Sequence, residues 1–404
     1  MNPDLAQLKK YPFERLSELF SGLEPPKFLK NIPLSIGEPK HSPPEFVAEV
    51  INSSMDKLSV YPSTKGTLEL RSTIACWLKT RFNLHYIDPE SQVLPVNGTR
   101  EALFSFAQST INRSADPLIL MPNPFYQIYE GAAILSGANI HFLNCDHKTG
   151  FLADFNSVAE KTWESCQLIY ICSPGNPNGA VLSLDKMQEL IILADRYDFI
   201  IASDECYSEI YYDEKKPPTG LLEASSMMNR HDYSRCVVFH SLSKRSNLPG
   251  LRSGFVAGDE KILEQFLCYR TYHGCAMPLS SQLASISVWN DEKHVRENRM
   301  KYREKFNIFK DILGDILPHD IPDGGFYLWA NISSAELGSD EDFCKNLYLK
   351  QNITVLPGRY LGRISQNKNP GENYVRMALV APVDECREAA ERIKQFIMSS
   401  RKEL

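Results

Sequence analysis

The residues with the clearest chemical potential lie in the stretch SLSKRSNLPGLRSGF, which runs from Ser241 to Phe255. It places one lysine, Lys244, among small polar residues, and an arginine, Arg252, eight positions further on. A lysine amine can form a Schiff base with a carbonyl compound. An arginine can hold a phosphate or carboxylate through two parallel hydrogen bonds. Taken alone, the stretch fits a surface loop as well as a phosphate cradle around a reactive amine.

Four other polar sets follow short apolar runs in the same way as Ser241–Lys244 follows CVVFH. The sets are Asn97–Arg100 after QVLPV, Pro122–Tyr126 after LILM, Ser173–Gly179 after QLIYIC, and Asp204–Tyr207 after FIIAS. In an open α/β sheet, ligands bind beyond the carboxyl ends of the strands. We therefore expect these sets to meet at one rim and to form a single site.

The chemistry of the sets is complementary. Backbone N–H groups at the start of a helix can bind a phosphate, and hydroxyl and guanidinium groups can complete its shell. An aromatic ring can stack on a flat ligand, and a carboxylate can keep a ring nitrogen protonated. A phosphorylated pyridine with a phenolic oxygen and an aldehyde, pyridoxal phosphate (PLP), matches all of them. The predicted cofactor-binding residues are Gly98, Thr99, Arg100, Tyr126, Asn176, Asp204, Tyr207, Ser241, Ser243, Lys244 and Arg252.

The elements that must position these residues alternate along the chain. Continuous apolar runs alternate with amphipathic helical segments, one of which Ser183 caps. This pattern predicts an α/β fold with a mostly parallel sheet covered on both faces. Near residue 290 the sequence pattern changes: a highly charged helical segment is followed by shorter helical and strand-like segments, which predict a smaller α+β domain. We expect an N-terminal arm over residues 1–45 that packs with the small domain, a large domain over 46–290, and a small domain over 291–404.

Composition limits the possible partners. Lys and Arg total 44 against 50 Asp and Glu, so the net charge of −6 offers no basic field for nucleic acid. None of the ten cysteines forms a Cys-x-x-Cys pair, and no metal site is expected. No apolar run approaches the length of a membrane span, and the N-terminus has no signal-like apolar stretch. These features predict a cytoplasmic protein that acts on small molecules.

Eight motifs, in order along nearly the whole chain, resemble one enzyme family. They are SIGEP, YPSTKGTLELR, NGTREAL, SPGNPNG, SDECY, SLSKRSNLPGLRSGF, GGFYLW and YVRMAL. The sequence is similar to the PLP-dependent class I/II aminotransferases of fold-type I. Within that family it most resembles the bacterial N-succinyldiaminopimelate aminotransferases of lysine biosynthesis, a likeness carried by YPFERL, SIGEPKHSPPEF and QVLPVNGTREALFSFAQ. The family usually reads Asn-Pro-Thr-Gly where Asn178 replaces the threonine here.

The resemblance implies a role for each site residue. Lys244 would form the Schiff base with PLP and move the proton, and Asp204 would hold the ring nitrogen. Asn176 and Tyr207 would contact the ring oxygen, and Tyr126 would stack on the ring. The substrate α-carboxylate would be held by Arg376, Asn176 and Gly37. Tyr61 would reach the phosphate of the neighbouring subunit, which implies a homodimer with shared active sites.

The expected reaction is ping-pong amino transfer between glutamate/2-oxoglutarate and N-succinyl-2,6-diaminopimelate. Alternatives are an aspartate, alanine or acetylornithine aminotransferase, a carbon–sulfur β-lyase, and a PLP-binding regulator, for which the N-terminus offers no DNA-binding segment. The sequence does not single out the residue that contacts a distal acidic group. The candidates are Lys40, Lys65, Arg100, Arg245, Arg359 and Arg363, and Arg245 has no role that the sequence indicates.

Overall fold

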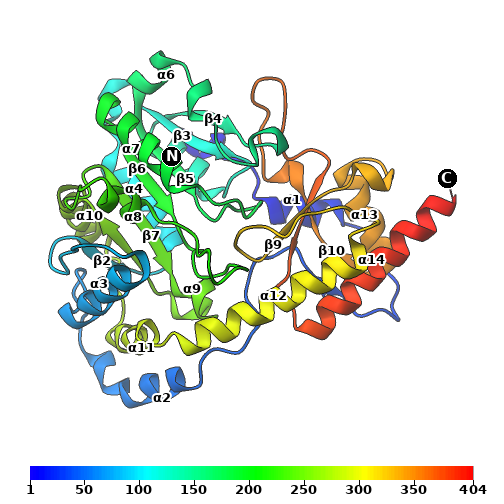
Figure 1. Ribbon diagram of the computed structural model, residues 1–404, viewed down its shortest axis with the longest axis horizontal. Coiled ribbons are helices and arrows are strands. Elements are labelled where there is room, and N and C mark those ends of the chain that lie inside the picture. Colours follow the sequence, from blue (N-terminus) through cyan, green and yellow to red (C-terminus); the bar gives the residue numbers. More distant parts are fainter. Residues whose placement is uncertain (404) are drawn as a thin grey trace.

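A seven-stranded sheet lies at the centre of the larger part of the molecule (Figure 1). The structure is a computed structural model that describes residues 1–403. The strand order is β2-β8-β7-β6-β5-β3-β4. The strands are β2 (Val93–Val96), β3 (Leu118–Asn123), β4 (Asn139–Asn144), β5 (Cys166–Cys172), β6 (Ile200–Asp204), β7 (Cys236–Ser241) and β8 (Gly254–Gly258).

The directions of these strands bring the polar sets to one rim. Strands β4, β3, β5, β6 and β7 are parallel neighbours, which confirms the mostly parallel sheet expected from the sequence. Strand β8 is antiparallel to both β7 and β2, so β2 runs in the same direction as β7. The residues that follow β2, β6 and β7 therefore share a rim with Arg252, which precedes β8.

Successive side chains of a strand point to opposite faces of the sheet. Apolar side chains lie on both faces here, so helices cover both of them. In β5, Leu168 and Tyr170 face a core shared with α4 (Thr99–Thr110), α5 (Ile128–Leu135) and α10 (Glu260–His273). Ile169 and Ile171 face the opposite core. That core is built by α3 (Leu68–Phe82), α7 (Leu184–Tyr197), α8 (Leu221–Met227) and α11 (Leu279–Trp289). Ser183 caps α7 as predicted, since its side chain accepts from the amide of Lys186.

A second core lies in the C-terminal part. There α12 (Lys293–Leu313), α13 (Asp340–Gln351) and α14 (Val383–Glu403) pack with a three-stranded sheet of order β11-β12-β9. Its strands are β9 (Tyr327–Asn331), β11 (Leu356–Pro357) and β12 (Tyr374–Ala378). Strand β1 (Ile32–Pro33) pairs in parallel with β10 (Ile353–Thr354), so the N-terminal segment adds Ile32 and Leu34 to this core. The domain boundaries at residues 45 and 290 stay a prediction.

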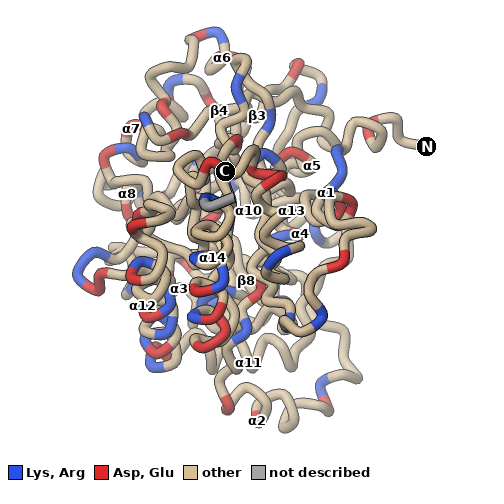
Figure 2. The backbone as a smooth tube through the Cα atoms, turned by 90° about the vertical axis from the view of Figure 1, so that its right-hand side faces the viewer, with Lys and Arg blue, Asp and Glu red and all other residues tan. Residues whose placement is uncertain are grey.

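The remaining helices are α1 (Pro12–Leu19), α2 (Phe46–Ser53), α6 (Glu160–Ser165) and the short α9 (Leu242–Arg245), which follows β7 and is largely buried. Along the described chain, Lys and Arg are interspersed with Asp and Glu (Figure 2). No helix within residues 1–403 is both long enough and apolar enough to cross a bilayer.

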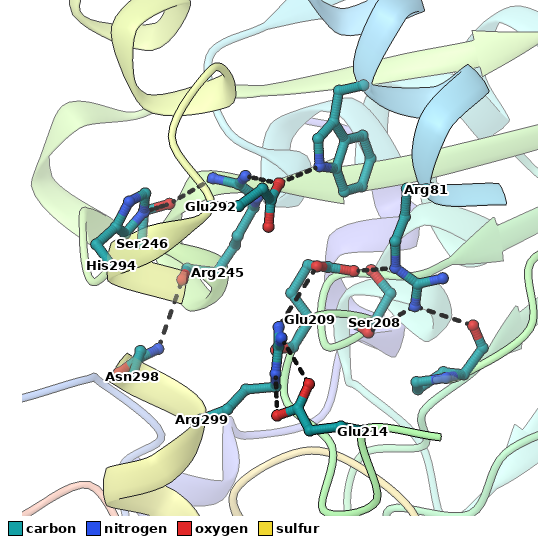
Figure 3. Close-up of polar contacts among 12 residues, drawn as sticks. Arg81, Ser208, Glu209, Glu214, Arg245, Ser246, Glu292, His294, Asn298 and Arg299 are labelled. Carbon is teal, nitrogen blue, oxygen red and sulfur yellow. Dashed lines mark hydrogen bonds and ion pairs between the residues drawn. The ribbon is translucent and has the colours of Figure 1, made fainter. Parts of the chain in front are cut away.

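A buried charge cluster connects the large sheet to α12 (Figure 3). Glu209, 4% exposed, accepts a hydrogen bond from Arg81 Nε of α3 at 2.6 Å and lies 3.8 Å from Arg299 Nη1 of α12. Burial would raise the pKa of Glu209, but the charges of Arg81, Arg245 and Arg299 outweigh burial and hold it below its usual range. Arg299 also pairs with Glu214 at 2.9 Å, on the exposed side of the cluster.

Replacing Glu209 with glutamine should lower the free energy of unfolding by about 3 kcal/mol, because it leaves buried guanidinium groups without their counter-charge. The matched change Glu214→Gln removes a partner that is 45% exposed, so it should cost less than about 1 kcal/mol. Urea unfolding followed by tryptophan fluorescence measures both values. Equal losses for the two variants would contradict the dominant role assigned to burial.

Candidate active site

A cavity of about 530 Å³ lies at the rim where the polar sets meet. Segments far apart in the sequence build its walls: the N-terminal segment, the start of α4, the ends of β6 and β7, and β12. The predicted residues that line it are Gly37, Thr99, Arg100, Tyr126, Asn176, Asp204, Tyr207, Ser241, Ser243, Lys244, Arg252 and Arg376. Gly98 and Tyr61, the other two predicted residues, are not among its lining residues.

Lys244 lies in α9, directly after β7. Ser241 begins this short helix, and its hydroxyl accepts from the amide of Ser243 at 3.1 Å. The Lys244 amine donates to the carbonyl of Gly37 at 2.6 Å, and no carboxylate of the described residues forms an ion pair with it. Burial, assisted by the charges of Arg376 and Arg100, lowers the pKa of Lys244 to about 8. About a tenth of this amine is therefore unprotonated at pH 7, far more than for an ordinary lysine.

Asp204 is the last residue of β6 and is 4% exposed. Its carboxylate accepts hydrogen bonds from the Tyr129 hydroxyl at 2.6 Å and from the Cys206 amide at 3.3 Å. Burial raises the pKa of Asp204, and the hydrogen bonds from Cys206 and Tyr129 only partly oppose that effect. Within residues 1–403, no cationic side chain forms an ion pair with this carboxylate. A positive group placed beside it would stabilise its ionised form.

Arg252 and the start of α4 form the end of the cavity suited to an anion. The Arg252 guanidinium donates to two backbone carbonyls, those of Pro249 at 2.9 Å and Asn97 at 3.5 Å, and to no carboxylate in the described chain. Gly98 precedes α4 with a φ of 82°, and a Cβ there would lie 2.3 Å from Arg252 Nη2. Gly98 thus does not line the cavity itself, but its lack of a side chain leaves room for the Arg252 guanidinium.

Arg376 enters the cavity from β12. Although it is 3% exposed, its guanidinium meets only neutral acceptors, Asn176 Oδ1 at 2.9 Å and the Ser35 carbonyl at 2.8 Å. The Tyr327 ring lies against it, with the Arg376 Cζ 4.3 Å from the ring centroid. A Cβ on Gly37 would lie 1.9 Å from the Tyr327 hydroxyl, so this close approach requires glycine.

The aromatic residues of the cavity are held by polar contacts. The Tyr126 hydroxyl accepts from Arg100 Nε at 2.6 Å, and the Tyr207 and Tyr327 hydroxyls lie 3.1 Å apart. Tyr327 was not a predicted site residue, although the motif GGFYLW contains it. Other lining residues that sequence reasoning missed are Tyr11, Phe13, Glu38, Cys206 and Leu361. Of these, Cys206 lies in SDECY, Glu38 in SIGEP, and Tyr11 and Phe13 in YPFERL, whereas Leu361 lies in none of the quoted motifs.

Among the six candidates for a distal acidic group, only Arg100 lines the cavity. The other five side chains pair with carboxylates elsewhere: Lys40 with Glu38, Lys65 with Glu90, Arg245 with Glu292, Arg359 with Asp340, and Arg363 with Glu130. The Arg100 guanidinium donates to the neutral Tyr126 hydroxyl. It is therefore the candidate cation that remains available to a ligand.

Arg245 follows Lys244 in sequence but points into the protein interior (Figure 3). Its guanidinium, 2% exposed, pairs with Glu292 at 2.5 Å and donates to the Val288 carbonyl at 3.0 Å. The rings of Trp77 and Trp289 lie near its Cζ, with centroids at 5.6 and 4.8 Å. Arg245 therefore anchors α9 to the corner between α11 and α12.

Another cluster, outside the cavity, has side chains of the types that bind metals. Ligand atoms of Glu101, His273 and Cys275 lie within 4.8 Å of one another. However, Arg270 Nη1 donates to both Glu101 carboxylate oxygens, at 2.7 and 2.8 Å. The carboxylate is thus already neutralised by a guanidinium that is fully buried, which disfavours a cation at this position.

The unpaired charges of the cavity fit PLP. Asp204 has no cationic partner among residues 1–403, and a protonated pyridine nitrogen would provide one. Arg252 and the N-terminus of α4 lack an anion, which a phosphate would provide. Lys244 offers an amine with a lowered pKa to an aldehyde. The ring nitrogen, the phosphate and the aldehyde of PLP would therefore each find a complementary group in this cavity.

Known proteins are similar to this chain in sequence and in fold. An aminotransferase from Neisseria meningitidis is 49% identical, with a TM-score of 0.93 over 98% of this chain and 99% of that one. The LL-diaminopimelate aminotransferase of Syntrophobacter fumaroxidans is 30% identical over 97% of both chains. A probable N-succinyldiaminopimelate aminotransferase from Thermus thermophilus is 25% identical, with a TM-score of 0.83 over 95% of this chain and all of that one.

The sequence model of the family described as "Aminotransferase class I and II" matches residues 30–393, which include every cavity-lining residue except Tyr11, Pro12 and Phe13. Its boundaries span nearly all of the motifs on which the resemblance rested. The fold, the cavity and the match agree, and this chain belongs to the class I and II aminotransferases, which are PLP-dependent enzymes.

Proposed function

We propose that this aminotransferase transfers the amino group between glutamate/2-oxoglutarate and N-succinyl-2,6-diaminopimelate. The observation that carries the proposal is the charge pattern of the cavity. After Arg252, Asp204 and Arg376 are assigned to the cofactor and the substrate α-carboxylate, Arg100 remains as a cation for a second acidic group. A substrate with an extra carboxylate at its distal end satisfies this pattern.

The chain's residues would hold the cofactor by its two ends. Arg252, Thr99, Ser241 and Ser243 are assigned to the phosphate, and Asp204 to the ring nitrogen. Tyr126 is assigned to the ring face, and Asn176 and Tyr207 to the ring oxygen. When bound, PLP supplies an electron sink that stabilises negative charge at the substrate α-carbon. The Asp204 carboxylate supports this chemistry by keeping the ring nitrogen protonated.

Lys244 is assigned the proton transfer. Its Nζ, with a pKa lowered to about 8, can accept a proton and return it near neutral pH. Arg376 can hold the α-carboxylate through paired hydrogen bonds, with Asn176 and the backbone at Gly37 beside it. These contacts would orient the α-hydrogen toward the lysine, which determines where the proton leaves and returns.

The two candidate substrates differ in the chemical groups at the end of the molecule far from the reacting amine. LL-diaminopimelate carries a distal ammonium beside its carboxylate, whereas the N-succinyl compound replaces the ammonium with an amide and adds a carboxylate. The carboxylate available to an ammonium is Glu38, but Lys40 already pairs with it at 2.7 Å. This arrangement favours the succinylated substrate. LL-diaminopimelate stays the second candidate because a relative that is 30% identical carries that name.

A homodimer is part of the proposal. Tyr61 is fully exposed and lies outside the cavity of its own chain. An exposed aromatic ring with a hydroxyl is well suited to an interface that is partly apolar and partly wet. We assign Tyr61 to the phosphate site of a second copy, so that each site needs both chains.

The substrate assignment predicts the outcome of half-reactions with the PLP-loaded enzyme. Loss of its visible absorbance would be followed with N-succinyl-2,6-diaminopimelate, LL-diaminopimelate, glutamate, aspartate and alanine. We expect glutamate and the succinylated compound to react, the latter at least about tenfold faster than LL-diaminopimelate, a difference equivalent to one charge-assisted hydrogen bond. Faster reaction of LL-diaminopimelate would select the second candidate. Reaction of aspartate or alanine alone would remove both.

Arg100→Gln provides the matching specificity test. It should lower kcat/KM for N-succinyl-2,6-diaminopimelate at least about tenfold, through the loss of a charged contact. The kcat/KM for alanine, which has no distal acid, should change much less. Arg196→Gln, at a site that is 63% exposed on α7, is the control and should behave as the parent enzyme. An equal loss for both substrates would show that Arg100 acts on the cofactor rather than on the distal group.

The lowered pKa of Lys244 predicts the pH dependence of cofactor uptake. Only the unprotonated amine is nucleophilic, so uptake of PLP by the cofactor-free protein should rise with pH, with a midpoint of about 8. Below that midpoint the rate should fall about tenfold per pH unit, as the ammonium form takes over. Stopped-flow absorbance measures the rate. A midpoint near the unperturbed value of 10.5 would contradict the environment described for Lys244.

A further inference from the structure

Lys305 of α12 is a buried cation without a carboxylate partner in the described chain. It is fully buried, and its Nζ donates to the Leu379 carbonyl at 3.1 Å and to His41 Nε2 at 2.7 Å. The face of the Tyr302 ring lies 4.9 Å from the Nζ. Burial is the main cause that lowers the pKa of Lys305 to about 8. The charge of this side chain therefore depends on a few neutral acceptors, one of which is His41.

His41 is held in one tautomer by its two partners. An ammonium group can only donate, so Nε2 of His41 must accept from Lys305. The proton of the neutral ring is then on Nδ1, which donates to Asn298 Oδ1 at 2.7 Å. Burial and the charge of Lys305 lower the pKa of His41 to about 4, so the ring is neutral at ordinary pH. His41 therefore passes a directed hydrogen bond from Lys305 to Asn298.

Asn298 continues this chain of hydrogen bonds to the backbone of the reactive lysine. Its Oδ1 also accepts from Asn247 Nδ2 at 3.1 Å, which fixes the orientation of the amide. Its Nδ2 then faces the carbonyls of Lys244 and Arg245, both at 3.5 Å. Figure 3 shows Asn298 reaching from α12 toward this carbonyl edge of α9. The side chain is 3% exposed, so water does not compete freely for these contacts.

The same segment that carries His41 also forms part of the cavity wall. Gly37 lies four positions before His41, and its carbonyl accepts the hydrogen bond from the Lys244 amine at 2.6 Å. The N-terminal segment is therefore connected to Lys244 twice, once through the Gly37 carbonyl and once through His41 and Asn298. One connection meets the side chain of Lys244 and the other meets its backbone.

We propose that His41 is a positioning residue for catalysis, which fixes the segment from Ile36 to Lys40 against the backbone of Lys244 by way of Asn298. The inference rests on the proposed role of Lys244. Its consequence is a fixed spacing between the segment that would contact the substrate α-carboxylate and the amine that would move the proton. Lys305 serves this contact by setting the tautomer of His41.

The first test is His41→Phe in the full-length, PLP-loaded protein. Phenylalanine keeps a ring against Tyr302, whose centroid lies 4.8 Å from that of His41, but removes both hydrogen bonds. We expect hydrogen exchange in peptides covering residues 35–41 to become at least about tenfold faster, and kcat/KM to fall by a similar factor. Lys310→Met, at an exposed lysine further along α12, is the control and should leave both unchanged.

A double variant separates positioning from simple stability. His41→Phe leaves Lys305 with one acceptor fewer, so its melting temperature should fall. Adding Lys305→Met removes the buried ammonium as well, and replacing both polar partners by apolar groups can be nearly neutral for stability. The double variant should therefore recover most of the melting temperature. Its fast exchange over residues 35–41 and its low kcat/KM should persist.

Two results would overturn the proposal. The first is recovery of both kcat/KM and slow exchange in the double variant, which would limit His41 to satisfying Lys305. The second is parental exchange and kinetics in His41→Phe itself. The exchange measurement does not depend on which residue moves the proton. Failure of the role assigned to Lys244 would therefore leave accelerated exchange in His41→Phe intact.

Discussion

The site depends on charges that the chain holds in one cavity without pairing them. Asp204 is a buried carboxylate with no cationic partner in the described chain, and the Lys244 amine donates only to a backbone carbonyl. Such groups are costly unless a ligand compensates them. The same chain pairs many other arginines with carboxylates, including Arg81, Arg245 and Arg270. Several unpaired charges of the described chain thus gather where a charged cofactor and substrate fit, whereas the buried Lys305 lies outside the cavity.

Strand direction and one long helix maintain this arrangement. Antiparallel β8 begins at the rim where its neighbours β2 and β7 end, which brings Arg252 beside the start of α4. The first turns of α12 then hold α9 from behind, through Glu292 to Arg245 and through Asn298 to the carbonyls of residues 244 and 245. Because α12 continues into the C-terminal core, the position of Lys244 is connected to the part of the molecule that supplies Arg376.

Much of the cavity was predictable because strand ends are local features. An apolar run followed by a small polar set marks a rim position, so residues such as Asp204 and Asn176 were found without the fold. Contacts between distant segments were not predictable. Nothing near Arg245 in the sequence shows that its side chain points to Glu292, and no local signal connects His41 to Lys305. The antiparallel direction of β8 could not be predicted either, because an apolar run does not indicate which way its strand runs in the sheet.

We propose that the cavity holds PLP on Lys244. Reduction of the PLP-loaded protein with borohydride would fix the cofactor covalently to the lysine that carries it, and peptide mass spectrometry would locate the label. We expect a pyridoxyl group on the peptide that contains Lys244, at about one label per chain. A label on another lysine, or no label in protein that shows the visible absorbance of bound PLP, would contradict it.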